Sequence, residues 1–306
     1  MSNVRAIFVA DLHLQAKAPL ARSTEPDWFE AVARPLAEIS GLALRYKAPV
    51  LYAGDIFDRW NAAPEVINFA LAHLPPGYAV PGQHDLPNHN YDEIKRSAYW
   101  TLVEAGKLVN LPPNHPFEIY EWGGLTVYGY PWGYEQIPLD GGDGDGLHVA
   151  IAHKFVYTKD TGYPGAPTDG QISACRQNLA GYDVAVFGDN HKGFTYRVKG
   201  GSLVFNCGGM MRRKIDERDY KPSIGLLHSD GTVTRHYLDT TQDKFVESTE
   251  AEELVEKLLD MTEFVAELRG LGTDDALDFG TAIRRFLDSN RVSGRTRDLV
   301  LEASDA

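Results

Sequence analysis

The sequence predicts an α/β fold built from two mixed sheets flanked by helices. Two observations carry this prediction. Short apolar stretches with the length of buried strands alternate with segments of helical periodicity in the first part of the chain. β-rich regions with glycine turns follow later in the chain. The expected buried strands cover residues 5–10, 49–53, 78–80, 147–152 and 183–187.

Helical segments connect the early strands. Residues 28–46, 64–74 and 97–105 have helical periodicity, and each would return the chain from one strand to the next. Residues 117–130 and 194–238 have the β-rich pattern, with Gly-Gly and Asp-Gly pairs at the expected turns. These regions supply the remaining strands of the sheet pair.

The character of the chain changes after Thr240. A capping box at residues 249–252 predicts a helix that ends before Gly270, and a second amphipathic run covers residues 274–287. We therefore expect a main domain of residues 1–245 and a small helical appendage of residues 246–306. The apolar stripe of the appendage either caps the main domain or forms a docking surface for a partner protein or a second subunit.

Composition narrows the class of protein. The chain has 306 residues, a hydrophobic content of 43% and no run near the roughly 18 apolar residues of a membrane span. The N-terminus lacks the residue order of a signal peptide. Cys175 and Cys207 are the two cysteines, and they lie far apart in the sequence. These observations predict a cytoplasmic protein with reduced thiols and no membrane association.

Five short polar motifs follow the five predicted buried strands. Because chemistry gathers beyond the carboxyl ends of strands in an open α/β sheet, we expect the motifs to converge on one site. Their carboxylates and imidazoles suit manganese, iron or zinc, and the absence of cysteine argues against a structural zinc finger. The motifs are Asp11-Leu12-His13, Gly54-Asp55-Ile56-Phe57-Asp58, Gly82-Gln83-His84-Asp85, a lone His153, and Gly188-Asp189-Asn190-His191.

The five motifs, in this order, resemble those of the calcineurin-like metallophosphoesterases. The resemblance implies an αββα sandwich and a phosphoester hydrolase with two divalent metal ions. It implies that His84 protonates the leaving oxygen and that Asp58 orients His84, while a metal-bridging hydroxide attacks phosphorus. The implied ligands are Asp11, His13, Asp55 and His191 for the first ion, and Asp55, Gln83, His153 and Asp189 for the second, with Asp55 bridging.

Two positions depart from the family pattern, and both are implied ligands of the second ion. Gln83 stands where the family usually has asparagine, and Asp189 stands where it has histidine. Glutamine keeps a carbonyl oxygen, and aspartate replaces a neutral imidazole with a harder anionic ligand. We expect a site retuned toward Mn²⁺ or Mg²⁺, with Fe²⁺ and Zn²⁺ as alternatives.

One stretch of the chain has a surplus of positive charge. The net charge is -13, yet residues 192–221 hold eight basic and three acidic residues. This stretch either contacts a phosphate backbone or forms an ordinary solvated surface. On the first interpretation, Arg212, Arg213 and Lys214 bind DNA.

Within the family, the chain resembles the nuclease subunits of SbcD type. The grounds are the Asn206-Cys207-Gly208-Gly209-Met-Met-Arg-Arg segment and the helical extension. This resemblance implies DNA as substrate, and a coiled-coil ATPase subunit or a second copy bound through the C-terminal helices. The alternatives are a phosphatase or cyclic-nucleotide phosphodiesterase, and a metal-poor scaffold that binds proteins. The presence of Asp55 and His84 argues against the scaffold.

Overall fold

The computed structural model describes residues 3–113, 115–119, 124–139 and 146–246. The chain divides into two compact units, Met1–Phe245 and Val246–Ala306. The predicted helices of the appendage, and the docking surface they would carry, lie outside the described residues. No helix in the described part of the chain is long and apolar enough to cross a membrane.

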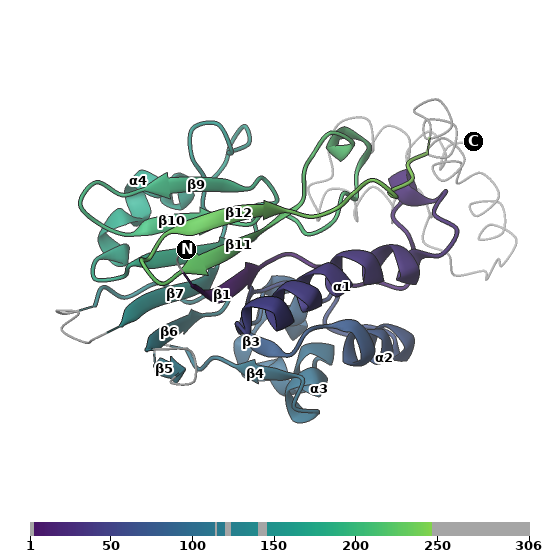
Figure 1. Cartoon of the computed structure of the whole chain (residues 1–306), viewed down its shortest axis with the longest axis horizontal. Helices are drawn as coiled ribbons and strands as arrows, with labels where there is room; N and C mark the ends of the chain where they lie inside the picture. Colours follow the sequence, from purple (N-terminus) through teal and green to yellow (C-terminus); the bar gives the residue numbers. More distant parts are fainter. Residues whose placement is uncertain (1–2, 114, 120–123, 140–145, 247–306) are drawn as a thin grey trace, which may run out of the picture. The chain divides into compact units, whose positions relative to one another are not determined.

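Two mixed sheets form the centre of the first unit (Figure 1). In the described residues each sheet has six strands, ordered β12-β11-β1-β2-β3-β4 and β5-β6-β7-β8-β10-β9. The first sheet contains β1 (Val4–Val9), β2 (Val50–Ala53), β3 (Gly77–Val80), β4 (Leu108–Asn110), β11 (Ser223–His228) and β12 (Val233–Tyr237). The second contains β5 (Pro116–Ile119), β6 (Leu125–Tyr130), β7 (Leu147–His153), β8 (Val184–Gly188), β9 (Phe194–Arg197) and β10 (Leu203–Asn206).

The central strands of each sheet run parallel. Strands β1 to β4 are parallel neighbours, as are β6, β7, β8 and β10. Strands β11 and β12 extend the first sheet in antiparallel fashion, and β5 and β9 do so at the two edges of the second. The carboxyl ends of β1, β2 and β3 therefore lie together, as do those of β7 and β8.

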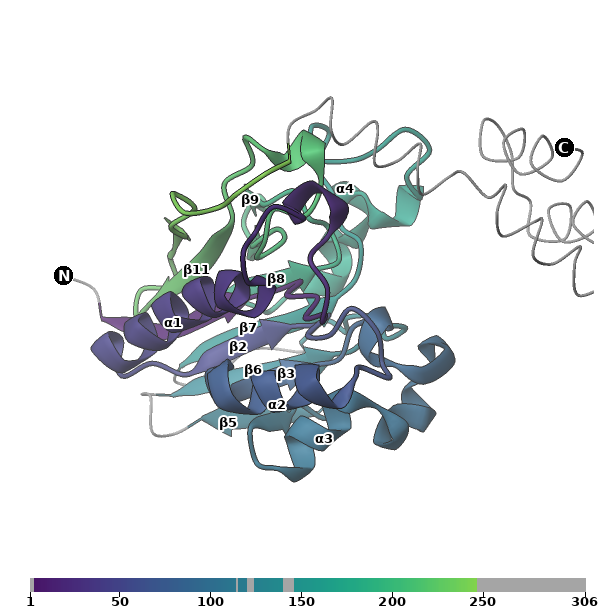
Figure 2. The same cartoon turned by 90° about the vertical axis from the view of Figure 1, so that its right-hand side faces the viewer.

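Helices cover the outer faces of the sheets. The helices are α1 (Trp28–Tyr46), α2 (Pro64–His73), α3 (Ala98–Glu104) and the short α4 (Ile172–Cys175). Figure 2 shows α1, α2 and α3 on one side of the first sheet. Short 3-10 turns span Leu20–Arg22, Gln83–Asp85, Pro87–His89, Tyr91–Arg96, Thr168–Gly170, Arg176–Leu179 and Ile215–Glu217.

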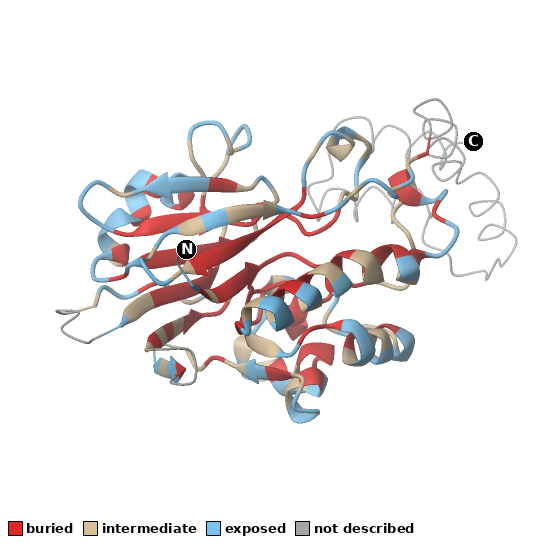
Figure 3. Ribbon diagram, in the orientation of Figure 1, coloured by how far each residue is buried: buried red, intermediate tan, exposed pale blue. Residues whose placement is uncertain are grey.

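Successive side chains of a strand point to opposite faces of its sheet and so pack in different layers of the fold. Ile7 and Val9 of β1 pack in the cluster that contains the helices, whereas Ala6 and Phe8 pack against the second sheet. A third cluster joins Phe187 of β8 to Ile172 of α4 on the far side of the second sheet. Figure 3 shows the buried residues concentrated along the central strands. This arrangement confirms the predicted α/β fold with two mixed sheets between helices.

Candidate metal centre

The five polar motifs meet beyond the carboxyl ends of β1, β2, β3, β7 and β8. Asp55, which follows β2, lies at the middle of this meeting point. Its Oδ2 atom is 3.4 Å from His153 Nε2, 3.7 Å from His13 Nε2 and 4.0 Å from His84 Nε2. Its Oδ1 atom accepts a hydrogen bond from the backbone N–H of His84 at 3.0 Å. A carboxylate with histidines on several sides suits a ligand shared between two ions.

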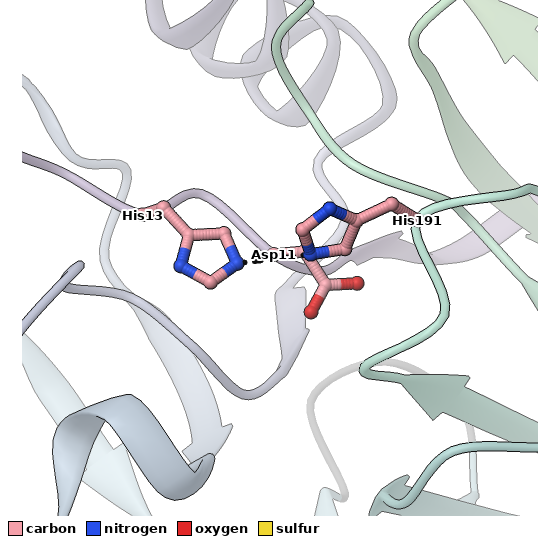
Figure 4. A group of neighbouring side chains, drawn as sticks. All are labelled: Asp11, His13 and His191. Carbon is pink, nitrogen blue, oxygen red and sulfur yellow. Dashed lines mark hydrogen bonds between the residues drawn. The ribbon is translucent and has the colours of Figure 1, made fainter. Parts of the chain in front are cut away.

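The first ligand group contains Asp11, His13 and His191, whose ligand atoms lie within 4.8 Å of one another. Figure 4 shows the two imidazole rings pointing toward each other, with Asp11 beside them. Their Nε2 atoms are 3.0 Å apart. Asp11 and His13 are almost fully buried, at 1% and 4% exposure. Two imidazoles and a carboxylate facing one point form a suitable donor set for a divalent transition metal.

A second ligand group includes Asp55 and shares Asp11 with the first. Asp11, Asp55 and His153 form a further set with ligand atoms within 4.8 Å. Gln83 and Asp189 lie next to each other, with Gln83 Nε2 donating to Asp189 Oδ1 at 2.9 Å. The backbone N–H of Asp189 in turn donates to Asp11 Oδ1 at 2.9 Å. The structure thus brings all seven predicted metal ligands into one cluster.

Several buried polar atoms of this cluster lack a hydrogen-bond partner. They include Asp11 Oδ2 and Gln83 Oε1, which have no partner among the described residues. Buried polar atoms are normally paired, so such a group needs a physical explanation. Carboxylate oxygen, amide oxygen and imidazole nitrogen together are ligands for manganese, iron or zinc. The residues therefore fit a pair of divalent ions.

The backbone of the ligand loops adopts an uncommon conformation. Four predicted ligands have positive φ angles: Asp11 (52°), His13 (46°), Asp55 (52°) and Asp189 (75°). Residues other than glycine adopt this region at a cost, and such strain gathers at functional sites. Gly54 also has positive φ (91°), and a Cβ atom there would lie 2.1 Å from His153 Nδ1. The glycine lets the β2 loop approach the ligand histidine.

Residues 4–193 match the family of the calcineurin-like phosphoesterases. The chain belongs to this family. The predicted family resemblance is thereby confirmed, and with it the assignment of the chain as a metal-dependent phosphoesterase. The match ends before most of the basic stretch at residues 192–221, so it says nothing about that stretch. No curated protein matches the chain.

Solved structures of other family members and hydrolases show low similarity. TT1561 of Thermus thermophilus is 15% identical, with 77% of this chain and 100% of that chain covered and a TM-score of 0.45. The calcineurin-like phosphoesterase YfkN of Bacillus subtilis is 10% identical, with 84% and 96% covered and a TM-score of 0.47. The phosphopantetheinyl hydrolase PptH of Mycobacterium tuberculosis is 15% identical, with 80% and 100% covered and a TM-score of 0.41. Similarity this low carries no information about the substrate.

Opposite charges dominate the electrostatics of this phosphoesterase centre. Burial lowers the pKa of His153, but the nearby Asp55, Asp11 and Asp189 outweigh burial and raise it to about 10. Burial raises the pKa of Asp55, yet His153 and His13 hold it below the ordinary value. Burial raises the pKa of Asp11 and lowers that of His13. A divalent ion binds neutral imidazole, so it would compete with a proton for His153.

His84, the predicted general acid, lies at the rim of the centre. Its side chain is 44% exposed. Its Nδ1 atom is 2.8 Å from the backbone carbonyl oxygen of Asp58, so Asp58 contacts the ring through its backbone. The Asp58 carboxylate points elsewhere: Oδ1 accepts from Arg213 Nη2 at 2.6 Å and lies 3.8 Å from His13 Nδ1. The resemblance implied that Asp58 orients His84, and in the structure the contact between them is made by the Asp58 backbone carbonyl.

The three predicted substrate-binding residues have three different environments. Arg213 donates to Asp58 and also to Gln15 Oε1 at 3.0 Å, so it belongs to the metal centre. Arg212 donates to Asp243 Oδ2 and to the carbonyl oxygens of Thr240 and Arg218. These internal partners leave Arg212 poorly suited to bind a phosphate. Lys214 is exposed and lines the cavity beside the centre.

Sequence reasoning missed the structural role of Asp85. This buried carboxylate accepts hydrogen bonds from the backbone N–H groups of Ile56 (3.1 Å), Phe57 (2.9 Å) and Gly82 (3.0 Å). Burial, with the charge of Asp55, raises its pKa to about 7. Asp85 therefore joins the loops of the second and third motifs. The sequence signal for this role was the position of Asp85 as the last residue of the third motif.

The metal centre opens into a cavity of about 490 Å³. His13, Asp55, Gln83 and His84 form its floor on the metal side. This volume is within the range of about 300–1,000 Å³ that is typical of small-ligand sites. The cavity gives a phosphoester direct access to the candidate ions and to His84.

Proposed function

We propose that the protein is a two-metal phosphodiesterase that cleaves DNA, of the SbcD type. The observation that carries the phosphodiester chemistry is the placement of His84 at the open rim, with Nε2 4.0 Å from Asp55 Oδ2. A proton donor there stands beside the point that both candidate ions would share. A DNA phosphodiester has an alkoxide leaving group, which is poor, so a positioned acid contributes about 10²- to 10⁴-fold to its cleavage.

Different residues of the chain would bind the ions, orient the acid and donate the proton. Bound divalent ions would withdraw charge from the phosphate and lower the pKa of a water molecule. Asp55 would hold both ions, with Asp11, His13 and His191 on one side and Gln83, His153 and Asp189 on the other. The Asp58 carbonyl fixes the tautomer of His84 by accepting the Nδ1 proton. With a proton on each ring nitrogen, His84 would deliver the Nε2 proton to the departing oxygen and keep the Nδ1 proton.

DNA as substrate is supported by cationic side chains at the cavity. Lys192 and Lys214 line it and are exposed. Such lysines can contact phosphates that flank the scissile one. We propose Mn²⁺ as the preferred ion because two anionic or amide oxygens, from Asp189 and Gln83, stand in the second ligand group. A coiled-coil ATPase or a second copy remains a proposed partner, and its predicted docking helices lie outside the described residues.

A small-substrate phosphoesterase is the second candidate. The observation that favours it is the internal pairing of Arg212 with Asp243, which removes one cation from the proposed DNA surface. Asp216 and Glu217 also line the cavity and would repel a long polyanion.

An activity panel distinguishes the two candidates. Purified protein is assayed with Mn²⁺, Mg²⁺, Fe²⁺ and Zn²⁺ on single-stranded DNA, duplex DNA, a cyclic nucleotide and a chromogenic phosphodiester. We expect manganese-dependent cleavage of DNA and of the chromogenic diester. Cleavage of the cyclic nucleotide, with DNA left intact under every metal, would establish the small-substrate alternative.

A further inference from the structure

The cavity beside the metal centre has an aromatic wall formed by Phe155 and Tyr163. Both residues line the same cavity as His13 and Asp55. Their ring centroids are 5.1 Å apart with an interplanar angle of 60°. Tyr163 is 51% exposed. These two side chains thus expose aromatic surface to a molecule that enters the cavity.

The segment that carries this wall is held to the metal loop. Asn190 lies between the candidate ligands Asp189 and His191, and its side chain is buried. Its Nδ2 atom donates to the carbonyl oxygens of Val156 at 3.0 Å and Thr161 at 3.2 Å. The aromatic segment is therefore attached on both sides of its turn to the residue between two ligands.

The turn itself is closed by internal contacts. The backbone N–H of Thr158 donates to Thr161 Oγ1 at 2.9 Å, and the two hydroxyls are 3.0 Å apart. Gly162 packs against the ring of Tyr157, where an added Cβ atom would lie 2.7 Å from Tyr157 Cδ2. These contacts fix the chain immediately before Tyr163. The position of the exposed ring is thus defined by the fold.

The other aromatic residues near the centre already have partners. Tyr130 is 2% exposed and hydrogen bonds to Tyr182. Tyr134 packs against Tyr91 with ring centroids 5.4 Å apart. Trp132 packs against the ligand His153, with centroids 6.4 Å apart. Tyr220 also lines the cavity, and its hydroxyl donates to the carbonyl oxygen of Gly209 at 3.1 Å. Phe155 packs against Tyr157 and Tyr163, and among the described tyrosines and phenylalanines that line the cavity Tyr163 is the exposed one.

We propose that Phe155 and Tyr163 stack the nucleobase of the nucleotide whose phosphate lies on the metal centre. The proposal rests on the proposed function and names the part of the substrate that the cavity selects. Every nucleobase has a π-face, so an aromatic wall binds bases with little sequence preference. The cavity volume of about 490 Å³ can hold one nucleoside beside the metals. Recognition is thus of a single unpaired nucleotide, with its base turned into the cavity.

The test compares esters that share a leaving group and differ in the presence of a base. The substrates are the 5′- and 3′-(4-nitrophenyl phosphate) esters of thymidine, and methyl 4-nitrophenyl phosphate, each with the manganese-loaded full chain. Nitrophenolate leaves without help from an acid, so the assay reports binding and positioning. Tyr163→Ala should lower kcat/KM on the preferred thymidine ester by about 5- to 150-fold, mainly through KM, because stacking on an aromatic side chain has that value. The methyl ester should be cleaved at the parental rate.

Matched variants separate stacking from other effects. Tyr163→Phe keeps the ring and should retain the thymidine preference. Phe155→Leu keeps apolar volume but removes the ring, and should lose part of the preference. Tyr237→Ala removes another exposed aromatic, at 57% exposure, which does not line the cavity, and should change nothing. Manganese binding and the thermal unfolding midpoint are measured for each variant.

The outcomes distinguish this proposal from the proposed function. If Tyr163→Ala loses activity equally on the thymidine and methyl esters, or loses none, the base-stacking wall is wrong even where the parent cleaves DNA. If the parent leaves DNA intact but Tyr163→Ala abolishes its thymidine preference, the wall is correct and the substrate is a small nucleotide.

Discussion

The ligand loops and the basic stretch supply the same cavity with charge, but they differ in how they are built. The ligand loops carry short side chains on strained backbone directly after buried strands, and Asp11, His13, Asp55 and His153 are each at most 4% exposed. The basic stretch carries long side chains on irregular chain, and its neighbouring arginines point to different partners. Arg213 pairs with Asp58 and Arg212 with Asp243. The backbone conformation sets the positions of the short side chains in the ligand loops, whereas each long arginine of the basic stretch pairs with a different carboxylate.

Removal of the shared carboxylate should produce the largest effect. Asp55→Ala deletes the oxygen that lies near three histidines, so both ions lose a ligand. We expect metal affinity to fall by more than the roughly 10- to 100-fold typical of lost outer-shell contacts, with activity lost on every substrate. Elemental analysis and isothermal titration with Mn²⁺ measure the change. Retention of two ions per chain would show that Asp55 is not the bridge.

His84→Ala should separate chemistry from metal binding. His84 lies at the rim and is implied to protonate the leaving group, so the variant should keep its metal content. We expect about a 10²- to 10⁴-fold loss of kcat on an alkyl phosphodiester and little change on a nitrophenyl diester, whose leaving group needs no proton. Parental turnover of the alkyl diester would exclude His84 as the acid.

Substitution of Arg213 and of Arg212 tests the difference between the metal centre and the basic stretch. Arg213→Ala removes the partner of Asp58 and should reduce turnover of DNA and of a chromogenic diester alike, by about tenfold, because a charge-assisted hydrogen bond beside the centre is lost. Arg212→Ala breaks a largely buried ion pair and should lower the free energy of unfolding by about 3 kcal/mol while the metal-loaded activity is retained. Denaturant titration and steady-state kinetics on both variants measure these effects. A DNA-specific loss in Arg212→Ala would restore it as a phosphate contact.

The two departures from the family pattern should affect metal choice more than rate. Gln83→Asn with Asp189→His replaces an anionic oxygen by a neutral imidazole in the second ligand group. We expect a shift in preference from Mn²⁺ or Mg²⁺ toward Zn²⁺ or Fe²⁺. Competition titrations between metals give the preference. If the order and the affinities stay as in the parent, these two side chains do not bind the second ion.

Lys214→Ala should have the smallest effect. On the proposed DNA substrate, an exposed lysine at the cavity would contribute to binding through counterion release, so the slope of log affinity against log salt should fall by about one unit. Chromogenic diester cleavage should be unchanged, because that substrate has no flanking phosphate. An unchanged salt slope would remove Lys214 from the DNA-binding surface.

The strand ends could be predicted from the sequence because apolar stretches stop where polar motifs begin. Helix α1 runs from Trp28 to Tyr46 as predicted, with Asp27 accepting from the backbone N–H of Glu30 at its start. Strand β4 was missed because it has three residues and no ligand motif follows it, whereas the equally short stretch 78–80 is followed by the motif at residues 82–85. Residue proximity within the ligand cluster was likewise predictable, since parallel strands place their carboxyl ends together.

Contacts made by the backbone or by long side chains could not be predicted. The Asp58 carbonyl that holds His84 has no residue-type signature. Arg212 could pair with Asp243 because the chain returns beside it 31 residues later, and only the tertiary structure reveals that neighbour. The roles of Asp85 and Asn190 also depend on which backbone groups the fold brings within reach.

The hydrogen bonds that Asp85 accepts from Ile56, Phe57 and Gly82 bear on what happens when the protein loses its ions. Because three backbone amides from two loops hold this carboxylate, we expect the loops to keep their shape without an ion. Proteins whose metal site forms only on binding unfold when a chelator is added. Here EDTA should leave a folded, inactive apoprotein that regains activity on addition of Mn²⁺ without a refolding lag. The protein would then stay folded without metal, and its activity would depend on the concentration of free metal ions around it.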